Sequence, residues 1–173
     1  AVSAIHSYLI HQGLRTRCSL ILESGEPREV HHFALLFGYG ISAVNPYLAF
    51  ETVEAMGKEK GTFDLSLESA TDKFIKSVNK GLLKVMSKMG ISTLQSYRGA
   101  QIFEAVGLSA SLVDRYFEGT PTRLSGIGID MVAEEALSRH QAAFAPSFST
   151  EALGLDVGGE YQWRRSGEYH LFN

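Results

Sequence analysis

The sequence predicts an α/β fold in which short parallel strands alternate with helices, followed by an irregular C-terminal tail. Short apolar runs of strand length are separated by longer segments in which apolar side chains recur every three or four positions. Glycines lie at the ends of several helical segments, and the connections between segments are short. This alternation is typical of parallel α/β architecture. A length of 173 residues suits one domain of ordinary size.

The first third of the chain alternates regularly. Two apolar runs, 18–22 and 41–45, are predicted to be buried strands. Pro27 and Pro46 suit the first turn of the helix that follows each run. Helices with a closing glycine are predicted over 2–12, 27–38 and 46–56.

The remainder is predicted to be more helical. A long helix covers 68–89, and Gly81 inside it either costs about 1 kcal/mol relative to alanine or marks a break between two helices. A third parallel strand is predicted over 91–94. Further helices are predicted over 100–106, 112–117 and 131–144. We therefore expect a domain over residues 1–145 and, over 146–173, a polar, glycine-bearing connector that packs along a neighbouring domain.

Composition excludes several classes of protein. Lys and Arg total 16 against 19 Asp and Glu, so the chain has no basic footprint for nucleic acid or an anionic membrane. No apolar run approaches the roughly 20 residues that span a bilayer, and the N-terminus lacks the features of a signal peptide. The single cysteine, Cys18, is predicted to be an inert core residue of a strand. We expect a soluble chain from a reducing compartment, and a first residue other than Met suggests a piece of a longer protein.

Two segments follow predicted strands and precede predicted helices, which is where ligands bind in parallel α/β folds. In the first, Asn45 either faces a ligand or is the N-cap of the next helix, and the cap is favoured. In the second, 95–99, Ser96 can cap a helix and Arg98 can hold an anion or a carboxylate of a neighbouring domain. Capping and surface roles are favoured there too.

The histidines do not predict a metal site. His31 and His32 lie beside Glu29, but adjacent helical residues point about 100° apart and cannot share an ion as an i,i+4 pair can. His6 and His11 are five positions apart and also diverge.

Glycine and lysine patterns also favour structural roles. Residues 38–40 lie between a helix and the next strand, which indicates a helix end and turn, not a phosphate loop. Residues 126–130 lead into a helix that Asp130 would cap, where it would repel phosphate. A stripe of lysines is predicted to be a solvated helix face, formed by Lys73, Lys76, Lys80, Lys84 and Lys88.

Seven stretches, in order over nearly the whole chain, resemble the large subunit of glutamate synthase at the end of its central domain. They are GLRTR (13–17), ESGEPREVHHFA (23–34), GYG (38–40), VNPYLA (44–49), residues 80–105, DRYF (114–117) and GEYHLFN (167–173). The last stretch resembles the approach to the flavin-binding domain of that family.

The resemblance implies part of a degenerate β/α barrel-like central domain within an oxidoreductase that acts on CH–NH2 donors. The parent enzyme would form L-glutamate from glutamine-derived ammonia and 2-oxoglutarate, as a step of nitrogen assimilation. Its amidotransferase domain has an N-terminal cysteine nucleophile, and its synthase domain carries FMN and a 3Fe–4S cluster. Electrons come from a pyridine nucleotide-oxidising subunit or from ferredoxin.

None of that family's catalytic, flavin or cluster motifs maps onto this sequence, which begins with Ala1 and has only Cys18. We therefore assign no catalytic, cofactor-binding or metal residue, and expect a structural segment that links the amidotransferase and synthase sites and is inactive alone. The expected location is the cytoplasm, or a plastid if the parent is a ferredoxin-dependent plant or algal enzyme. The alternative hypothesis is an independent α/β barrel fragment that binds FMN or a phosphorylated ligand near Asn45 and 96–98.

Overall fold

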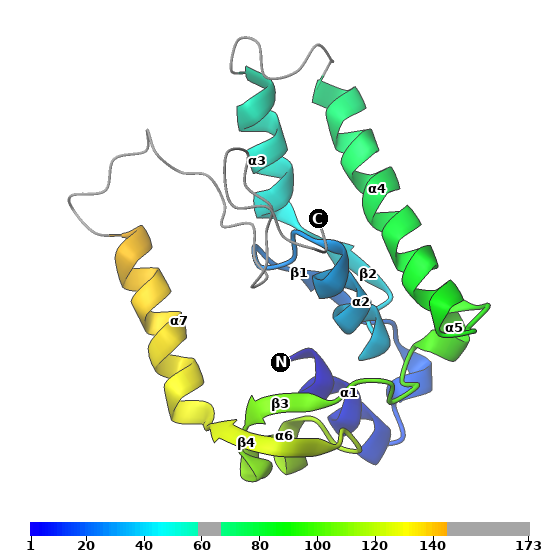
Figure 1. Cartoon of the computed structure of the whole chain (residues 1–173), viewed down its shortest axis with the longest axis vertical. Coiled ribbons are helices and arrows are strands. Elements are labelled where there is room, and N and C mark those ends of the chain that lie inside the picture. The colour runs from blue at the N-terminus through cyan, green and yellow to red at the C-terminus, as the bar shows by residue number, and fades with distance from the viewer. Residues whose placement is uncertain (59–66, 145–173) are drawn as a thin grey trace, which may run out of the picture.

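The computed structural model describes residues 1–58 and 67–144 (Figure 1). Its helices are α1 (Val2–His11), α2 (Val30–Gly38), α3 (Tyr47–Lys58), α4 (Leu67–Lys88), α5 (Leu94–Tyr97), α6 (Ala110–Tyr116) and α7 (Ile129–Ala143), with a 3-10 helix η1 (Arg15–Arg17). Its strands are β1 (Ile21–Glu23), β2 (Ala43–Asn45), β3 (Ala105–Leu108) and β4 (Thr122–Ile127).

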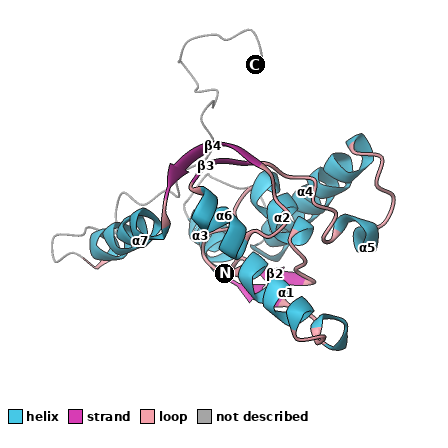
Figure 2. Ribbon diagram, turned by 90° about the horizontal axis from the view of Figure 1, so that it is seen from below, coloured by secondary structure: helices cyan, strands magenta, loops and turns pink. Residues whose placement is uncertain are grey.

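The described strands form two separate parallel pairs, as Figure 2 shows in magenta. Helix α2 connects β1 to β2, and α6 connects β3 to β4, so each pair is a βαβ unit. The second pair is irregular near Gly107, where φ is +76° and the register shifts. A Cβ on Gly126 would overlap the backbone of Gly107, so the two strands approach closely only because Gly126 has no side chain.

Much of the predicted architecture is confirmed. The run 18–22 overlaps β1 at Ile21 and Leu22, and the run 41–45 contains β2, so two parallel strands are present where they were predicted. The prediction that both are buried is wrong, because the first and last residues of each strand are exposed. Six predicted helices are present within a few residues of their expected ends, as α1, α2, α3, α4, α6 and α7. The fold is mixed α/β with parallel strands, which do not close into a barrel within the residues described.

Two predicted elements are wrong. Residues 91–94 are not a strand, because the Thr93 side chain accepts a hydrogen bond from the Ser96 N–H at 3.2 Å and caps the short helix α5. Residues 100–106 are not a helix, because the end of that segment enters β3.

Strand β4, which pairs with β3, was not predicted. It contains Arg123, Ser125 and Gly126 and has no apolar run that would reveal it.

The core lies where α2 meets α4 and α5. Its buried residues are Ala34, Leu82, Met86 and Tyr97. Tyr97 is fully buried, and its hydroxyl donates a 3.0 Å hydrogen bond to the Ala34 carbonyl. That bond satisfies a polar group that would otherwise be costly to bury. It also holds α5 against α2.

Aromatic packing holds α3 beside α4. The Phe50 ring on α3 and the Phe33 ring on α2 both meet Phe74 of α4 edge-on, with centroids 6.0 and 6.5 Å away. Figure 1 shows α3 and α4 running side by side away from the strands. The three rings therefore connect α2, α3 and α4 in one packed group.

Gly81 is a packing residue and not a helix break. Helix α4 runs unbroken through it. A Cβ at Gly81 would overlap the side chain of Val30 on α2, so the two helices can meet here only because Gly81 lacks one. Gly38, at the end of α2, faces the Phe103 ring in the same way.

We predict that Gly81→Ala destabilises the chain by up to about 2 kcal/mol, which is an overpacking cost of about 1–3 kcal/mol less a helix-propensity gain of about 1 kcal/mol. Alanine is the better helix former by about 1 kcal/mol, but overpacking against Val30 outweighs that gain. Denaturant unfolding of the variant, and of Gly81→Ala combined with Val30→Ala, measures the effect. The second substitution should recover part of the loss, and a Gly81→Ala chain more stable than the parent sequence would refute close packing at this point.

Candidate functional site

A cavity of about 610 Å³ lies between α1, β1, α2 and β3, and we call it the β1–β3 cavity. Cavities of this size commonly hold ligands. Its walls are mainly apolar, and they include Leu22, Pro27, Leu35, Leu36, Phe103 and Val106. The carboxylates of Glu26 and Glu104, the guanidinium of Arg28 and the imidazole of His32 also line it.

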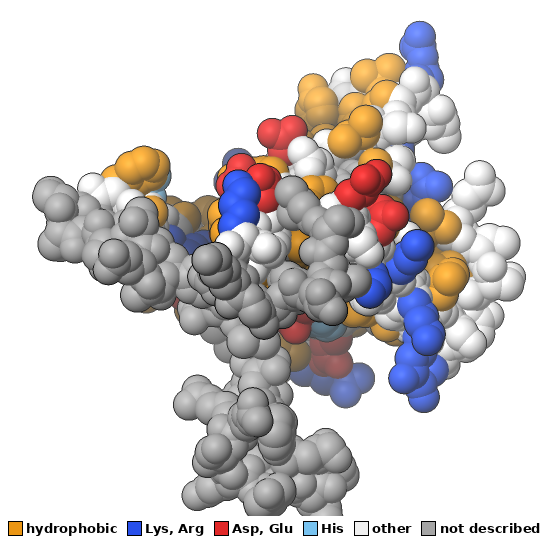
Figure 3. Space-filling view, turned by 90° about the horizontal axis from the view of Figure 1, so that it is seen from above, with side chains coloured by type: hydrophobic (Ala, Val, Ile, Leu, Met, Phe, Trp, Pro, Cys, Tyr) orange, Lys and Arg blue, Asp and Glu red, His pale blue; other side chains and the backbone are white. Residues whose placement is uncertain are grey.

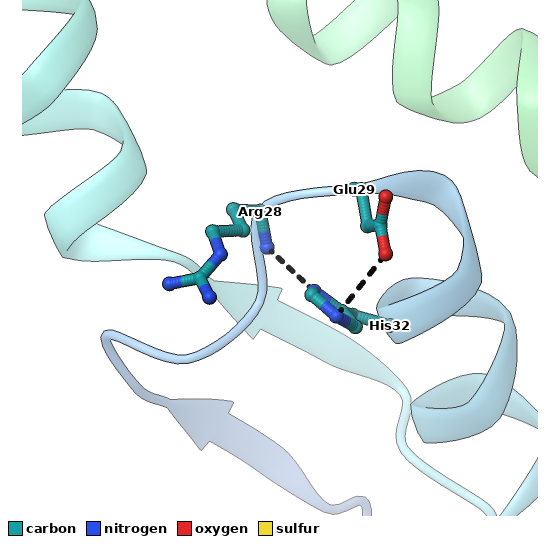
Figure 4. Close-up of polar contacts among 3 residues, drawn as sticks. All are labelled: Arg28, Glu29 and His32. Carbon is teal, nitrogen blue, oxygen red and sulfur yellow. Dashed lines mark hydrogen bonds and ion pairs between the residues drawn. The ribbon is translucent and has the colours of Figure 1, made fainter. Parts of the chain in front are cut away.

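Arg28, Glu29 and His32 form a polar cluster at the start of α2 (Figure 4). The Arg28 backbone N–H donates to Nδ1 of His32 at 3.3 Å, and His32 Nε2 lies 3.4 Å from Oε1 of Glu29. Because Nδ1 accepts, the ring proton is on Nε2 and faces the Glu29 carboxylate. The Arg28 side chain extends away from both partners, and its Nε is buried with no hydrogen-bond partner among the described residues.

The predicted histidine pair does diverge. His31 is exposed, whereas His32 is half-buried and turned toward Glu29. Within the described parts of the chain, no group of three or more His, Cys, Asp or Glu residues is placed to hold a metal ion.

Arg15 joins three segments of the chain through one side chain and two backbone carbonyls. Its Nε donates to Nδ1 of His6 at 2.9 Å, its Nη1 to the Cys18 carbonyl at 3.0 Å and its Nη2 to the Gly40 carbonyl at 2.6 Å. Gly40 has φ of +101°, and a Cβ there would overlap the His6 ring. The predicted helix end and turn at 38–40 is therefore confirmed. Sequence analysis missed Arg15, because its partners lie up to 25 positions away and no local pattern marks them.

Burial, and then the neighbouring Arg15 charge, lower the pKa of His6 below its ordinary value of 6.5. A neutral imidazole is also what the geometry requires, since Nδ1 must keep its lone pair to accept from Arg15. His6 lines a second cavity of about 270 Å³, together with His11, Gln101 and Glu118. His11 pairs there with Glu118 at 3.1 Å, and both side chains are exposed.

The alternative ligand site near Asn45 and 96–98 is not assembled. Arg98 does not begin a helix after a strand; it is the C-cap of α5, and its Nη1 donates to Ser42 Oγ at 3.1 Å. Ser42 precedes β2, whereas Asn45 ends it, so the two halves of the predicted site lie at opposite ends of the strand. Ser96 is not a cap either, because Thr93 has that role.

Three smaller predictions are also corrected. Helix α3 begins at Tyr47, so Asn45 belongs to β2 and is one residue too early to be its N-cap. Helix α7 has Gly128 as its N-cap, and Asp130 lies in its first turn. Cys18 is an exposed thiol that follows η1, because β1 begins only at Ile21.

The surface of the described residues is mixed in charge. The α4 lysines at 73, 76, 80, 84 and 88 are all exposed, which confirms the predicted solvated face. Figure 3 shows acidic, basic and apolar side chains interspersed on one side of the molecule. None of the helices in the described ranges has the length and apolar character needed to cross a membrane.

A family model and individual relatives both match this chain to glutamate synthases. A sequence model of the glutamate synthase central domain matches residues 1–109. The chain is 55% identical over 173 residues to the glutamate synthase [NADPH] large chain of Bacillus subtilis (strain 168), covering 100% of this chain and 11% of that protein.

Two further relatives are glutamate synthases whose names give other electron donors. Identity is 43% over 180 residues to glutamate synthase [NADH] of Saccharomyces cerevisiae, covering 99% of this chain and 8% of the relative. It is 45% over 181 residues to the ferredoxin-dependent glutamate synthase of Cyanidium caldarium, covering 99% and 12%. The chain thus spans about a tenth of the length of these relatives.

We predict that His6 makes the chain less stable in acid. Because its pKa is lower in the folded than in the unfolded state, the unfolded state binds more protons as the pH falls through 6.5. The free energy of unfolding should therefore drop between pH 7.5 and pH 5.5, and His6→Gln should remove part of that drop.

Denaturant unfolding at the two pH values measures this effect. His31→Gln is the matched control, because His31 is exposed on the surface of α2. An equal drop in His6→Gln and in the unchanged chain would show that the Arg15–His6 hydrogen bond is not the acid-sensitive contact.

Proposed function

Because the chain belongs to the glutamate synthase family through its central domain, we propose that it is a structural segment of a glutamate synthase large chain. The parent would form L-glutamate from glutamine-derived ammonia and 2-oxoglutarate with reducing electrons. The segment would hold the amidotransferase and synthase sites in register and help to enclose the ammonia path. Such coupling depends on fixed geometry and exclusion of water, not on acids and bases within the segment.

The observation that carries this proposal is the exposure of apolar strand residues. Ile21 on β1 is 74% exposed, Val106 on β3 66% and Leu124 on β4 62%. Parallel strands are ordinarily buried on both faces. Two open parallel pairs with apolar side chains in solvent are surfaces suited to cover by further protein, as expected of a segment inside a longer enzyme.

We propose that the domain extends over residues 1–145 and the connector over 146–173. The family match ends at 109, but β3 lies within it and pairs with β4, which lies beyond it. Helix α1 also packs on α6. These contacts support a single unit that continues past the matched range. The connector assignment depends on sequence alone, because residues 145–173 lie outside those described.

We assign no cofactor to this segment and place FMN and the 3Fe–4S cluster in the synthase domain of the parent. The partners are then the amidotransferase and synthase domains of the same chain. The relatives are named for NADPH, NADH and ferredoxin, so the parent would receive electrons from a pyridine nucleotide-oxidising subunit or from ferredoxin. The proposed location is the cytoplasm, or a plastid for a ferredoxin-dependent algal or plant parent.

We predict that the isolated chain neither hydrolyses glutamine nor forms glutamate from 2-oxoglutarate and ammonia with dithionite. It should also leave the absorbance bands of added FMN unshifted. Assays of both reactions and a flavin titration test this. Glutamate formation, or tight binding with shifted flavin bands, would favour an independent flavoprotein fragment over a structural segment.

The proposed coupling of the amidotransferase and synthase sites is tested with Arg98→Lys in the full-length parent. Arg98 Nε is buried without a partner among the described residues, while its Nη1 holds Ser42. Lysine keeps the charge but loses the fork that can span two acceptors. We expect more glutamine consumed per glutamate formed, with each partial reaction changed less than about twofold. Losing a charged hydrogen bond at a buried position corresponds to about 1–3 kcal/mol.

The matched control for that measurement is Arg17→Lys, since Arg17 is exposed. An Arg98→Lys parent with an unchanged consumption ratio and unchanged thermal stability would remove Arg98 from the coupling geometry.

A further inference from the structure

The β1–β3 cavity contains an arginine whose charge no described residue neutralises. Arg28 is half-buried, and its Nε is buried with no acceptor. Within the described ranges, its guanidinium makes no hydrogen bond or ion pair. Burying a charged donor without a partner costs free energy, so this arrangement indicates that an anion completes the site.

Three carboxylates on the same chain segment or cavity wall as Arg28 each contact another side chain. Glu29, its neighbour in sequence, lies against His32 at 3.4 Å, and Figure 4 shows Arg28 extending the other way. On the cavity wall, Glu26 lies 3.9 Å from Arg139 and Glu104 lies 3.3 Å from Arg123. None of the three carboxylates forms an ion pair with Arg28.

The backbone that carries Arg28 is fixed before any ligand arrives. Pro27, the preceding residue, is fully buried, and its ring restricts its own φ. The Arg28 N–H is held by His32 Nδ1. Because the backbone of Arg28 is constrained, its guanidinium loses less conformational freedom on binding than one carried by a mobile loop.

We propose that Arg28 is a carboxylate-binding residue, whose guanidinium pairs with a carboxylate that enters the β1–β3 cavity from outside the described residues. A single guanidinium presents a planar fork that matches the two oxygens of a carboxylate. The mainly apolar walls suit an occupant with an apolar body and one negative charge. Glu26 and Glu104 on the same walls oppose a more highly charged phosphate.

Two sources can supply that carboxylate. One is an Asp or Glu side chain of another segment of the parent, and this source depends on the proposed function. The other is a small free carboxylate in solution. The chemistry at Arg28 is the same for both sources, and the experiments below separate them.

The first experiment observes the arginine Nε–H signals of the ¹⁵N-labelled chain by NMR during a titration with sodium acetate at constant ionic strength. Ala1 is acetylated beforehand, because this residue lines the cavity and a free terminal amino group would offer acetate a second cation. The Arg28 signal is the one missing from the Arg28→Lys spectrum. It should shift saturably with acetate, and phosphate should require at least a several-fold higher concentration for the same shift.

Arg17→Lys is the matched control and should leave the acetate response intact, because Arg17 is exposed and outside the cavity. The absence of a saturable shift at Arg28, or equal shifts at all arginine signals, would overturn the proposal.

The second experiment compares thermal unfolding of the full-length parent with that of its Arg28→Gln variant, with and without acetate. If a side chain of the parent is the partner, the variant melts at a lower temperature and acetate has no effect on the unchanged enzyme. If a free carboxylate is the partner, acetate stabilises the unchanged enzyme and not the variant. A variant that melts like the unchanged enzyme, with no acetate response in either, rejects the proposal.

Coupling between glutamine hydrolysis and glutamate formation is a separate readout. A parent in which Arg98→Lys disturbs the coupling but Arg28 responds to no carboxylate rejects this inference alone. A carboxylate response at Arg28 with normal coupling in Arg98→Lys leaves the inference standing and counts against the proposed structural role.

Discussion

Close packing around helix α2 is the constraint on which the rest of the described structure depends. Gly81 of α4 lies against Val30 at one end of α2, and Phe103 lies against Gly38 at the other. Between them, the fully buried Tyr97 donates its hydroxyl proton to the Ala34 carbonyl. Because Phe103 leads directly into β3, the helix that connects the first strand pair also positions the second. Added volume at either glycine would separate elements that are far apart in sequence.

Within the described ranges, some apolar and some polar groups outside this core lack partners. Ile21 and Val106 expose apolar side chains on parallel strands, and Arg28 and Arg98 each bury an Nε without an acceptor among the described residues. Parallel strands ordinarily have both faces covered, and buried polar groups ordinarily have hydrogen-bond partners. Both departures fit a segment whose neighbours supply apolar cover and hydrogen-bond acceptors, which is the role proposed within a longer enzyme.

Two arginine–histidine contacts serve different purposes. Arg15 uses its whole guanidinium to tie α1, η1 and the turn after α2 together, with His6 as a neutral acceptor. Arg28 uses only its backbone N–H on His32 and keeps its guanidinium free of described partners. The first arrangement is complete within the chain, so it contributes to stability. The second is incomplete, so it indicates binding.

The sequence by itself determined the elements whose signals are local. Apolar periodicity identifies α1, α2, α4 and α7, and the short apolar runs identify β1 and β2, because the apolar residues of each element follow a helical or strand spacing within a few positions of one another. The family resemblance was likewise visible in residues such as 23–34 and was confirmed by comparison. Only the tertiary structure decided that 105–108 is a strand, that Gly81 is needed for packing, and that Arg98 and Asn45 lie at opposite ends of β2. It alone also showed a cavity in which the Arg28 guanidinium has no partner among the described residues, because pairing, close approach and burial depend on residues distant in sequence, which no local pattern records.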